Sequence, residues 1–369
     1  MSQSASPTQR PFRFWLRLTA SVHRRPSRRS FPQYNPAGTA ESTAEALSST
    51  ESGAENTAEK AEHITQTLSS GVKVDADVYV PESMQKSALA EMRGHGQLID
   101  YEKLKSLFCS GKTITEEGEE PWEMVTPGAM EAVGKYVSTQ DGDYLQRICG
   151  NTFYYMTERD IQDIEDLTIY ETGKNLDFAS IEETDKTIRD IAEKLNIAVG
   201  KGVCYTIDTS SQPHYVFQYE ILVNGMPLAM FDGGSYSGDA YVPGTYMTAV
   251  VDADGIRHYD VSYVLEELES GESKKVLTLD EALQAVDDKY NSVIMEGEYF
   301  IDDIQMAYTP IKTDDAGIVR LIPVWYFQTT HQILLPDKSG TGEIMLPQDG
   351  YILINALDGT ELLHENGEI

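Results

Sequence analysis

The side chains best suited to chemistry gather around one glycine-rich loop, residues 233–238. The candidate ligand-binding residues there combine aromatic rings, a hydroxyl and carboxylates: Phe231, Asp232, Ser235, Tyr236, Asp239 and Tyr241. The loop lacks the G-x-S-x-G pattern of a serine hydrolase, because Tyr236 stands where the serine belongs. It also lacks the Gly-Lys-Ser/Thr that ends a P-loop. These residues predict either a ligand pocket or an inter-strand loop whose glycines permit positive φ.

Two further ligand candidates, Trp325 and His331, lie within and just after an apolar strand expected at 321–328. His331 is a candidate for the rim of a site or a solvated loop histidine. The chain also has 21 tyrosines. Tyrosines favour either a binding face or the rim of a sheet with one wet side.

Patterns for metal binding and catalysis are weak. The run 252–255, Asp-Ala-Asp-Gly, resembles the start of a calcium loop, but its glycine comes too early and a turn explains it. The seven histidines are scattered without metal-ligand spacing. Acidic pairs are so abundant that choosing an acid and a nucleophile would be arbitrary. The sequence therefore predicts no catalytic residue, no metal and no cofactor.

The three cysteines, Cys109, Cys149 and Cys204, have no C-x-x-C spacing. One disulfide is arithmetically possible, and three small buried apolar side chains are the alternative.

Charge is distributed very unevenly along the chain. Residues 1–40 contain seven arginines and no Asp or Glu, so the remainder carries 22 Lys and Arg against 60 Asp and Glu. A body with a net charge of 22 − 60 = −38 repels nucleic acid and anionic lipid. We therefore expect no nucleic-acid partner.

The N-terminal residues predict two segments without a core. Residues 1–35 are basic, and they suggest an unstructured segment that touches a membrane, a transit peptide or a misplaced start. No run of 18 apolar residues predicts a membrane span. Residues 36–70, rich in Ala, Glu, Ser and Thr, predict a disordered linker.

Hydrophobic periodicity divides the rest into three regions. In 71–176 we expect a strand over Val72–Val80, a helix capped by Asp100, a helix at Met130–Val137 and a hairpin around Gly150. Regions 177–267 and 277–369 each begin with a capping box, formed by Ser180 with Glu183 and by Thr278 with Glu281. Hairpins are expected at Asn224-Gly225, at Asp254-Gly255 and, after a long loop at about 331–349, through Asp358-Gly359. The sequence predicts an α+β protein of two repeated helix-plus-antiparallel-sheet units after a smaller α+β region.

A family resemblance rests on the C-terminal strands. Ile322-Pro323-Val324-Trp325, with 351–355 and Ala356-Leu357-Asp358-Gly359, resembles the C-terminal half of PepSY-like domains. It is also similar to Yyc-type extracytoplasmic regulators of a sensor histidine kinase. Residues 71–369 resemble an uncharacterised family of secreted lipoproteins of gut Gram-positive bacteria, although the family's signal peptide and lipobox cysteine are not present in residues 1–70.

The resemblance implies a non-catalytic, lipoprotein-like surface protein. We expect it to be extracytoplasmic and to bind or regulate a protein or peptide partner at the cell envelope. Membrane contact is expected only through a tether that this chain does not show. The alternatives are a secreted hydrolase with its site near 231–241 and a PepSY-like protease inhibitor.

Overall fold

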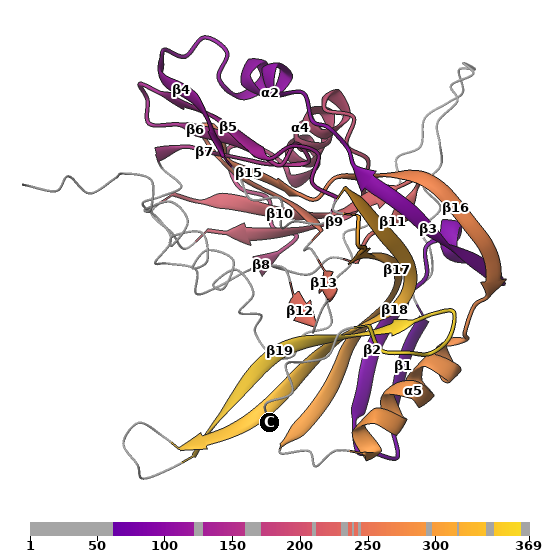
Figure 1. Cartoon of the computed structure of the whole chain (residues 1–369). Helices are drawn as coiled ribbons and strands as arrows, with labels where there is room; N and C mark the ends of the chain where they lie inside the picture. The colour runs from indigo at the N-terminus through magenta and orange to yellow at the C-terminus, as the bar shows by residue number, and fades with distance from the viewer. Residues whose placement is uncertain are drawn as a thin grey trace, which may run out of the picture.

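The structure is a computed structural model, and it describes residues 62–121, 128–158, 171–208, 212–229, 235–237, 240–242, 245–292, 297–315, 317–336 and 343–362. The predicted segment 1–35 and residues 36–61 of the predicted linker lie outside this part of the chain. Two large β-sheets and three α-helices form the described part (Figure 1). None of these helices has both the length and the apolar composition that a bilayer span requires.

Sheet A has seven strands, which come from both ends of the described chain. Its order is β1-β2-β17-β18-β3-β16, and β19 also pairs with β18. The strands are β1 Glu62–Thr67, β2 Lys73–Tyr79, β3 Ala88–Gly96, β16 Leu265–Lys275, β17 Glu298–Lys312, β18 Ile318–Pro336 and β19 Glu343–Asn355. β17 runs parallel to β2, whereas the other neighbouring pairs are antiparallel.

Sheet B has ten strands in the order β4-β5-β6-β7-β15-β14-β10-β9-β8, and β11 also pairs with β10. The strands are β4 Ile114–Pro121, β5 Val133–Thr139, β6 Tyr144–Ile148, β7 Thr152–Met156, β8 Glu171–Thr172, β9 Val199–Ile207, β10 His214–Val223, β11 Met226–Pro227, β14 Tyr246–Asp252 and β15 Gly255–Ser262. β12 (Ser235–Ser237) and β13 (Ala240–Val242) pair only with each other.

The predicted fold class is wrong. The described chain is mostly β, with two large and unequal sheets in place of repeated helix-plus-sheet units. The reason is long-range pairing: β7 completes the sheet that follows the first capped helix, and β2 and β3 complete the other sheet. Local periodicity reveals each strand but not a partner more than a hundred residues away.

Three α-helices are described, and their predicted caps are confirmed. They are α2 (Tyr101–Phe108), α4 (Ile181–Lys194) and α5 (Leu279–Asn291), while Glu82–Met84 forms one 3-10 turn, η2. The carboxylate of Asp100 accepts hydrogen bonds from the first turn of α2. Both capping boxes form as expected at α4 and α5, so each helix start has its backbone N–H groups satisfied locally.

Local predictions elsewhere had mixed outcomes. The alternating strand at Val72–Val80 is confirmed as β2, and the predicted hairpins form at β6–β7, β10–β11 and β14–β15. The loop expected at 331–349 is wrong, because β18 continues to Pro336 and β19 begins at Glu343, where the two strands pair. The predicted turn at Asp358-Gly359 closes only an isolated bridge between Ile354 and Glu361. The predicted helix at Met130–Val137 is wrong, because Val133–Thr139 is strand β5, paired on both sides. The last residues of the predicted linker also form a strand, β1.

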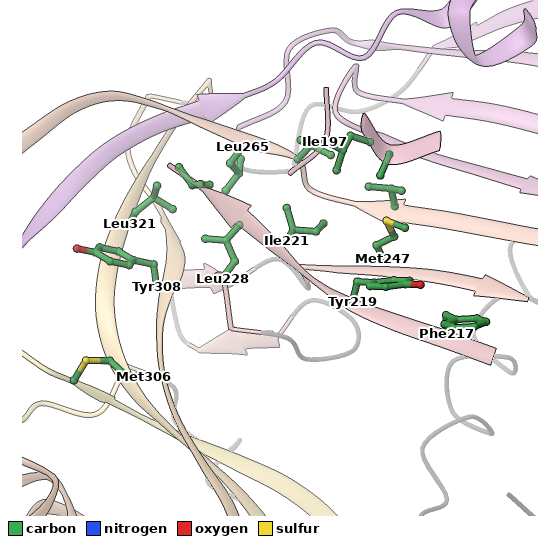
Figure 2. Packing of buried hydrophobic residues seen from close by; sticks show 14 of the residues in the cluster. Ile197, Phe217, Tyr219, Ile221, Leu228, Met247, Leu265, Met306, Tyr308 and Leu321 are labelled. Carbon is green, nitrogen blue, oxygen red and sulfur yellow. The ribbon is translucent and has the colours of Figure 1, made fainter. Parts of the chain in front are cut away.

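One apolar core joins the two sheets. Figure 2 shows Phe217, Tyr219 and Ile221 of β10 in the same cluster as Tyr308 of β17 and Leu321 of β18. The Tyr308 hydroxyl crosses sheet A to donate a hydrogen bond of 2.9 Å to the Ala90 carbonyl. Between β10 and sheet A lie Leu228, Leu265 and Leu321 (Figure 2), and the Ala229 N–H donates a hydrogen bond of 2.8 Å to the Tyr308 carbonyl. Close packing of these apolar side chains and this backbone contact join sheet A to sheet B.

Candidate functional site

The predicted loop site lies mostly beyond what the structure describes. Phe231, Asp232 and Asp239 are outside the described residues. The backbones of Ser235 and Tyr236 belong to β12 and that of Tyr241 to β13. The two short strands pair with each other, Tyr236 opposite Tyr241, and β13 lies against β17.

Trp325 and His331 lie on β18 and have partners within the fold. Trp325 is buried, and its indole N–H donates a hydrogen bond of 3.0 Å to the Leu277 carbonyl just before α5. The His331 ring stacks on Tyr299, with 3.8 Å between ring centroids. Both side chains therefore support the arrangement of sheet A.

One buried carboxyl has a pKa near neutrality, and it joins the two sheets. Glu220 of β10 accepts hydrogen bonds from the Lys201 backbone N–H at 3.1 Å and from the Gln305 amide of β17 at 2.6 Å. Burial raises the pKa of Glu220 from 4.5 to about 7. Only 5% of its surface is exposed, so this carboxyl is placed to fasten the sheets and not to meet a substrate.

Metal binding finds no support in the described residues, where no group of three or more His, Cys, Asp or Glu side chains is arranged to hold an ion. The three cysteines all lie in the described part of the chain, where they are buried thiols and form no disulfide. Burial is the first cause that raises the thiol pKa of Cys109, and it raises that of Cys204 to about 12. Such thiols are poor nucleophiles, which fits a packing role.

The feature of the fold best suited to binding is the outer edge of β1. Among the described strands, only β2 pairs with β1, over six consecutive residue pairs without a shift in register. In such a strand alternate N–H and C=O groups point away from the sheet and can pair with another chain. The residues of β1, EHITQT, include no proline and no lysine, which are the usual protections of an exposed edge.

A groove runs beside this edge. Its volume is about 560 Å³, and it lies between β1 and the beginning of α5. In Figure 1, α5 runs alongside β1 and β2 at the margin of sheet A. Ile64 of β1 and Leu279 of α5 are half-buried side chains in this lining, and both pack against the main core. The groove therefore offers two apolar contacts next to an open strand edge.

The two faces of β1 differ chemically. Ile64 lies opposite the buried Ala76 and so faces the core side. On the outer face, the His63 ring lies 2.8 Å from the Asp77 carboxylate and 3.1 Å from that of Asp75. The hydrogen bond to Asp77 is the main cause that raises the pKa of His63. An added strand would thus meet, on one face, a groove in which Ile64 and Leu279 lie among polar side chains, and carboxylates on the other.

Helix α5 holds the turn that follows β1. The Asp287 carboxylate accepts hydrogen bonds from the Ser69 hydroxyl at 2.6 Å and the Ser70 backbone N–H at 2.8 Å. Hydrogen bonds from Ser69 and Ser70 lower the pKa of Asp287 to about 2. Asn291 adds a further bond to the Ser69 hydroxyl at 2.9 Å. The edge strand and the helix that walls the groove are therefore tied together.

Sequence reasoning missed this site because it assigned residues 62–67 to the linker. The signal was present but short: Ile64, Thr65 and Thr67 are β-branched residues within six positions. A six-residue strand next to a long polar stretch does not stand out from composition. Only its pairing with β2 shows that these residues form a strand.

Comparison with known proteins gives the fold and no activity. No family model matches the chain, and no curated protein matches it. The structure is similar to the crystal structure of an uncharacterized protein from Eubacterium rectale ATCC 33656, with a TM-score of 0.65 and 16% sequence identity, over 80% of this chain and 91% of that one. At this identity the likeness shows a shared fold alone.

Proposed function

We propose that the protein is a non-catalytic binding module that takes up an extended peptide or protein segment by strand addition at β1. The observation that carries this proposal is the open outer edge of β1 beside the groove at α5. In strand addition, main-chain hydrogen bonds supply affinity and alternate side chains supply specificity. Ile64 and Leu279 would receive the apolar side chains of the added strand.

The proposed address is extracytoplasmic, at the cell envelope. It is supported by the acidic body and by the resemblance of residues 71–369 to secreted lipoproteins. A regulatory role would follow if the bound segment belongs to another envelope protein. The acidic body also favours basic partners, because the summed charge of the protein accelerates their association.

The test uses an eight-residue synthetic peptide with valine and lysine at alternate positions, added to the full chain. The matched control is the same peptide with N-methyl groups on alternate residues, which removes the N–H donors of one edge. We expect the first peptide to bind and to slow amide hydrogen exchange within 62–67, and the control peptide to do neither. Equal binding of both peptides, protection elsewhere only, or cleavage of the peptide would contradict the proposal.

A further inference from the structure

The outer edge of β1 is complementary to the same edge of a second copy of the chain. We propose that two copies pair antiparallel through β1, about a two-fold axis at Thr65, and so join their two copies of sheet A into one continuous sheet. This inference rests on the proposed function, because it names an occupant of that same edge. An external peptide then has to displace the second copy in order to bind.

The turn after β1 determines which backbone groups of the strand point outward. The Leu68 N–H donates a hydrogen bond of 2.9 Å to the Val72 carbonyl, which closes the ladder between β1 and β2. In an antiparallel ladder the hydrogen-bonded residues recur at every second position, and the register here has no shift. The even-numbered residues of β1 therefore bond to β2. The N–H and C=O groups of His63, Thr65 and Thr67 point away from β2.

One register uses all of these outward groups. A two-fold axis at Thr65 places this residue opposite its own counterpart, and places His63 of each copy opposite Thr67 of the other. Each of the three pairs can exchange two N–H···O bonds, about six in total. With the axis at Ile64 or Gln66, only two pairs of outward groups within β1 face each other. The register centred on Thr65 therefore forms the longest ladder.

The side chains of β1 are compatible with this register on both faces of the sheet. On the outer face Thr65 meets Thr65 of the second copy, and His63 meets Thr67. On the core side Ile64 meets Gln66, and both of these residues line the groove beside α5. No charged residue lies directly opposite a like charge, and threonine pairs across strands are favourable. The strand is thus self-complementary, as a two-fold interface requires.

Charge acts on this pairing in two opposite ways. Asp77 lies opposite His63, and Lys73 lies opposite Thr67. The row of residues across the joined sheets therefore begins at Asp77 of one copy and ends at Lys73 of the other, with opposite charges at its ends. The net charge of −31 on each chain repels the second copy at longer range. Because salt screens charges more than about 10 Å apart at 0.1 M, added salt should strengthen the dimer.

The test measures self-association of the full chain by sedimentation equilibrium between about 5 and 500 μM. Thr65→Lys and Thr65→Glu each place two like charges opposite each other at the axis, whereas an equimolar mixture of the two chains places a lysine opposite a glutamate. Thr115→Lys and Thr115→Glu are the matched controls, because Thr115 is an exposed threonine of β4, at the margin of sheet B.

We expect the natural chain to dimerise reversibly, and each Thr65 variant alone to dimerise at least about tenfold more weakly. The mixture of the two Thr65 variants should recover the affinity of the natural chain. The Thr115 variants, alone or mixed, should behave as the natural chain does. An excess of the valine–lysine peptide should dissociate the natural dimer, because both occupy the same edge.

Each other outcome has a separate meaning. A natural chain that stays monomeric throughout this range and still binds the peptide would overturn this inference and leave the proposed function standing. A mixture that dimerises no more tightly than its components would overturn the pairing at Thr65. A dimer that saturating peptide does not dissociate would show that the copies meet elsewhere, and would also overturn it. Failure of the peptide to bind the Thr65→Glu chain, in which the edge is free of a second copy, would overturn the proposed function itself.

Discussion

β1, at the margin of sheet A, pairs with β2 without a shift in register and has no charged residue at its centre. β4, at the margin of sheet B, has several features that discourage pairing with a further strand. β4 contains four glutamates within eight residues, an irregularity in its pairing with β5, and Pro121 at its end. Repulsion between such glutamates and an incoming acidic strand, together with the bulge, discourages pairing. The comparison teaches that, among the described strands, one edge carries features that discourage pairing and another does not.

The remaining edges resemble β4 more than β1. β16, at the far side of sheet A, is mostly charged and has two shifts in its register with β3. β19 ends in a bridge between Ile354 and Glu361, and its strand includes Pro347. β8 has only two residues. Since the same fold shows both kinds of edge, the openness of β1 is a local property of residues 62–67.

The largest expected effect concerns the contact that joins the two sheets. Because the pKa of Glu220 is raised in the folded protein, its contribution to stability is complete below about pH 4.5 and is lost as the pH rises through about 7. This group alone lowers the free energy of unfolding by up to about 3 kcal/mol over that range. We expect Glu220→Gln to remove this part of the pH dependence.

Urea unfolding at pH 5 and pH 8 measures the effect of Glu220→Gln. Its control is Glu272→Gln, the same exchange at an exposed position of β16. The Gln305 amide can rotate to accept a hydrogen bond from the amide introduced at position 220, so the variant keeps its contacts. An unchanged difference in stability between the two pH values would show that Glu220 is not a proton-linked contact between the sheets.

The next effect compares the two edges directly. Ile64→Glu removes an apolar contact from the groove and places a charge there, so we expect the valine–lysine peptide to bind about 30-fold more weakly, or roughly 2 kcal/mol. Ile114→Glu makes the same exchange at the first residue of β4, where the isoleucine is exposed. Titration calorimetry of both variants should show a loss only at β1. Equal losses would mean that the peptide does not distinguish the edges.

A smaller effect is expected where α5 holds the turn after β1. Asp287→Ala removes the acceptor for Ser69 and Ser70, and should lower the free energy of unfolding by about 1.5 kcal/mol. Asp288→Ala is the control, because this exposed neighbour bonds only within α5, to Gln284. Hydrogen exchange in 62–70 should accelerate in the first variant. Equal stability of the two variants would show that Asp287 does not stabilise the turn after β1.

The smallest effect concerns the start of α5, at the opposite end of that helix from Asp287. Trp325→Phe deletes the indole donor to the Leu277 carbonyl, immediately before the cap of α5. We expect a loss of about 1 kcal/mol in the free energy of unfolding, as for one buried hydrogen bond. Thermal unfolding checks this value. A loss several times larger would mean that Trp325 acts mainly through packing.

Local features of the fold could be predicted from the sequence because their causes are local. The capping boxes at Ser180 and Thr278 depend on residues three positions apart, and the turn at Asn224-Gly225 depends on two residues that adopt positive φ. Each was visible without any knowledge of partners. Such signals fix where elements begin and end, and they carry no information about which strands pair.

The pairing of strands into sheets could not be predicted, because it depends on residues that are far apart in the sequence. β2 pairs in parallel with β17 across more than 200 residues, and nothing in its alternating valines identifies that partner. The segment Met130–Val137 has residues suited to a helix, yet pairing with β4 and β6 makes 133–139 a strand. The candidate site depends on the same missing information, because an open edge exists only relative to a completed sheet.

The most direct test of strand addition at β1 is a search for nuclear Overhauser effects between the backbone of 62–67 and a bound valine–lysine peptide. The experiment uses the full chain. Our account predicts contacts from peptide backbone protons to alternate residues of β1, continuing the ladder that β1 forms with β2. Backbone contacts to β4 or β16, or contacts through side chains alone, would contradict it.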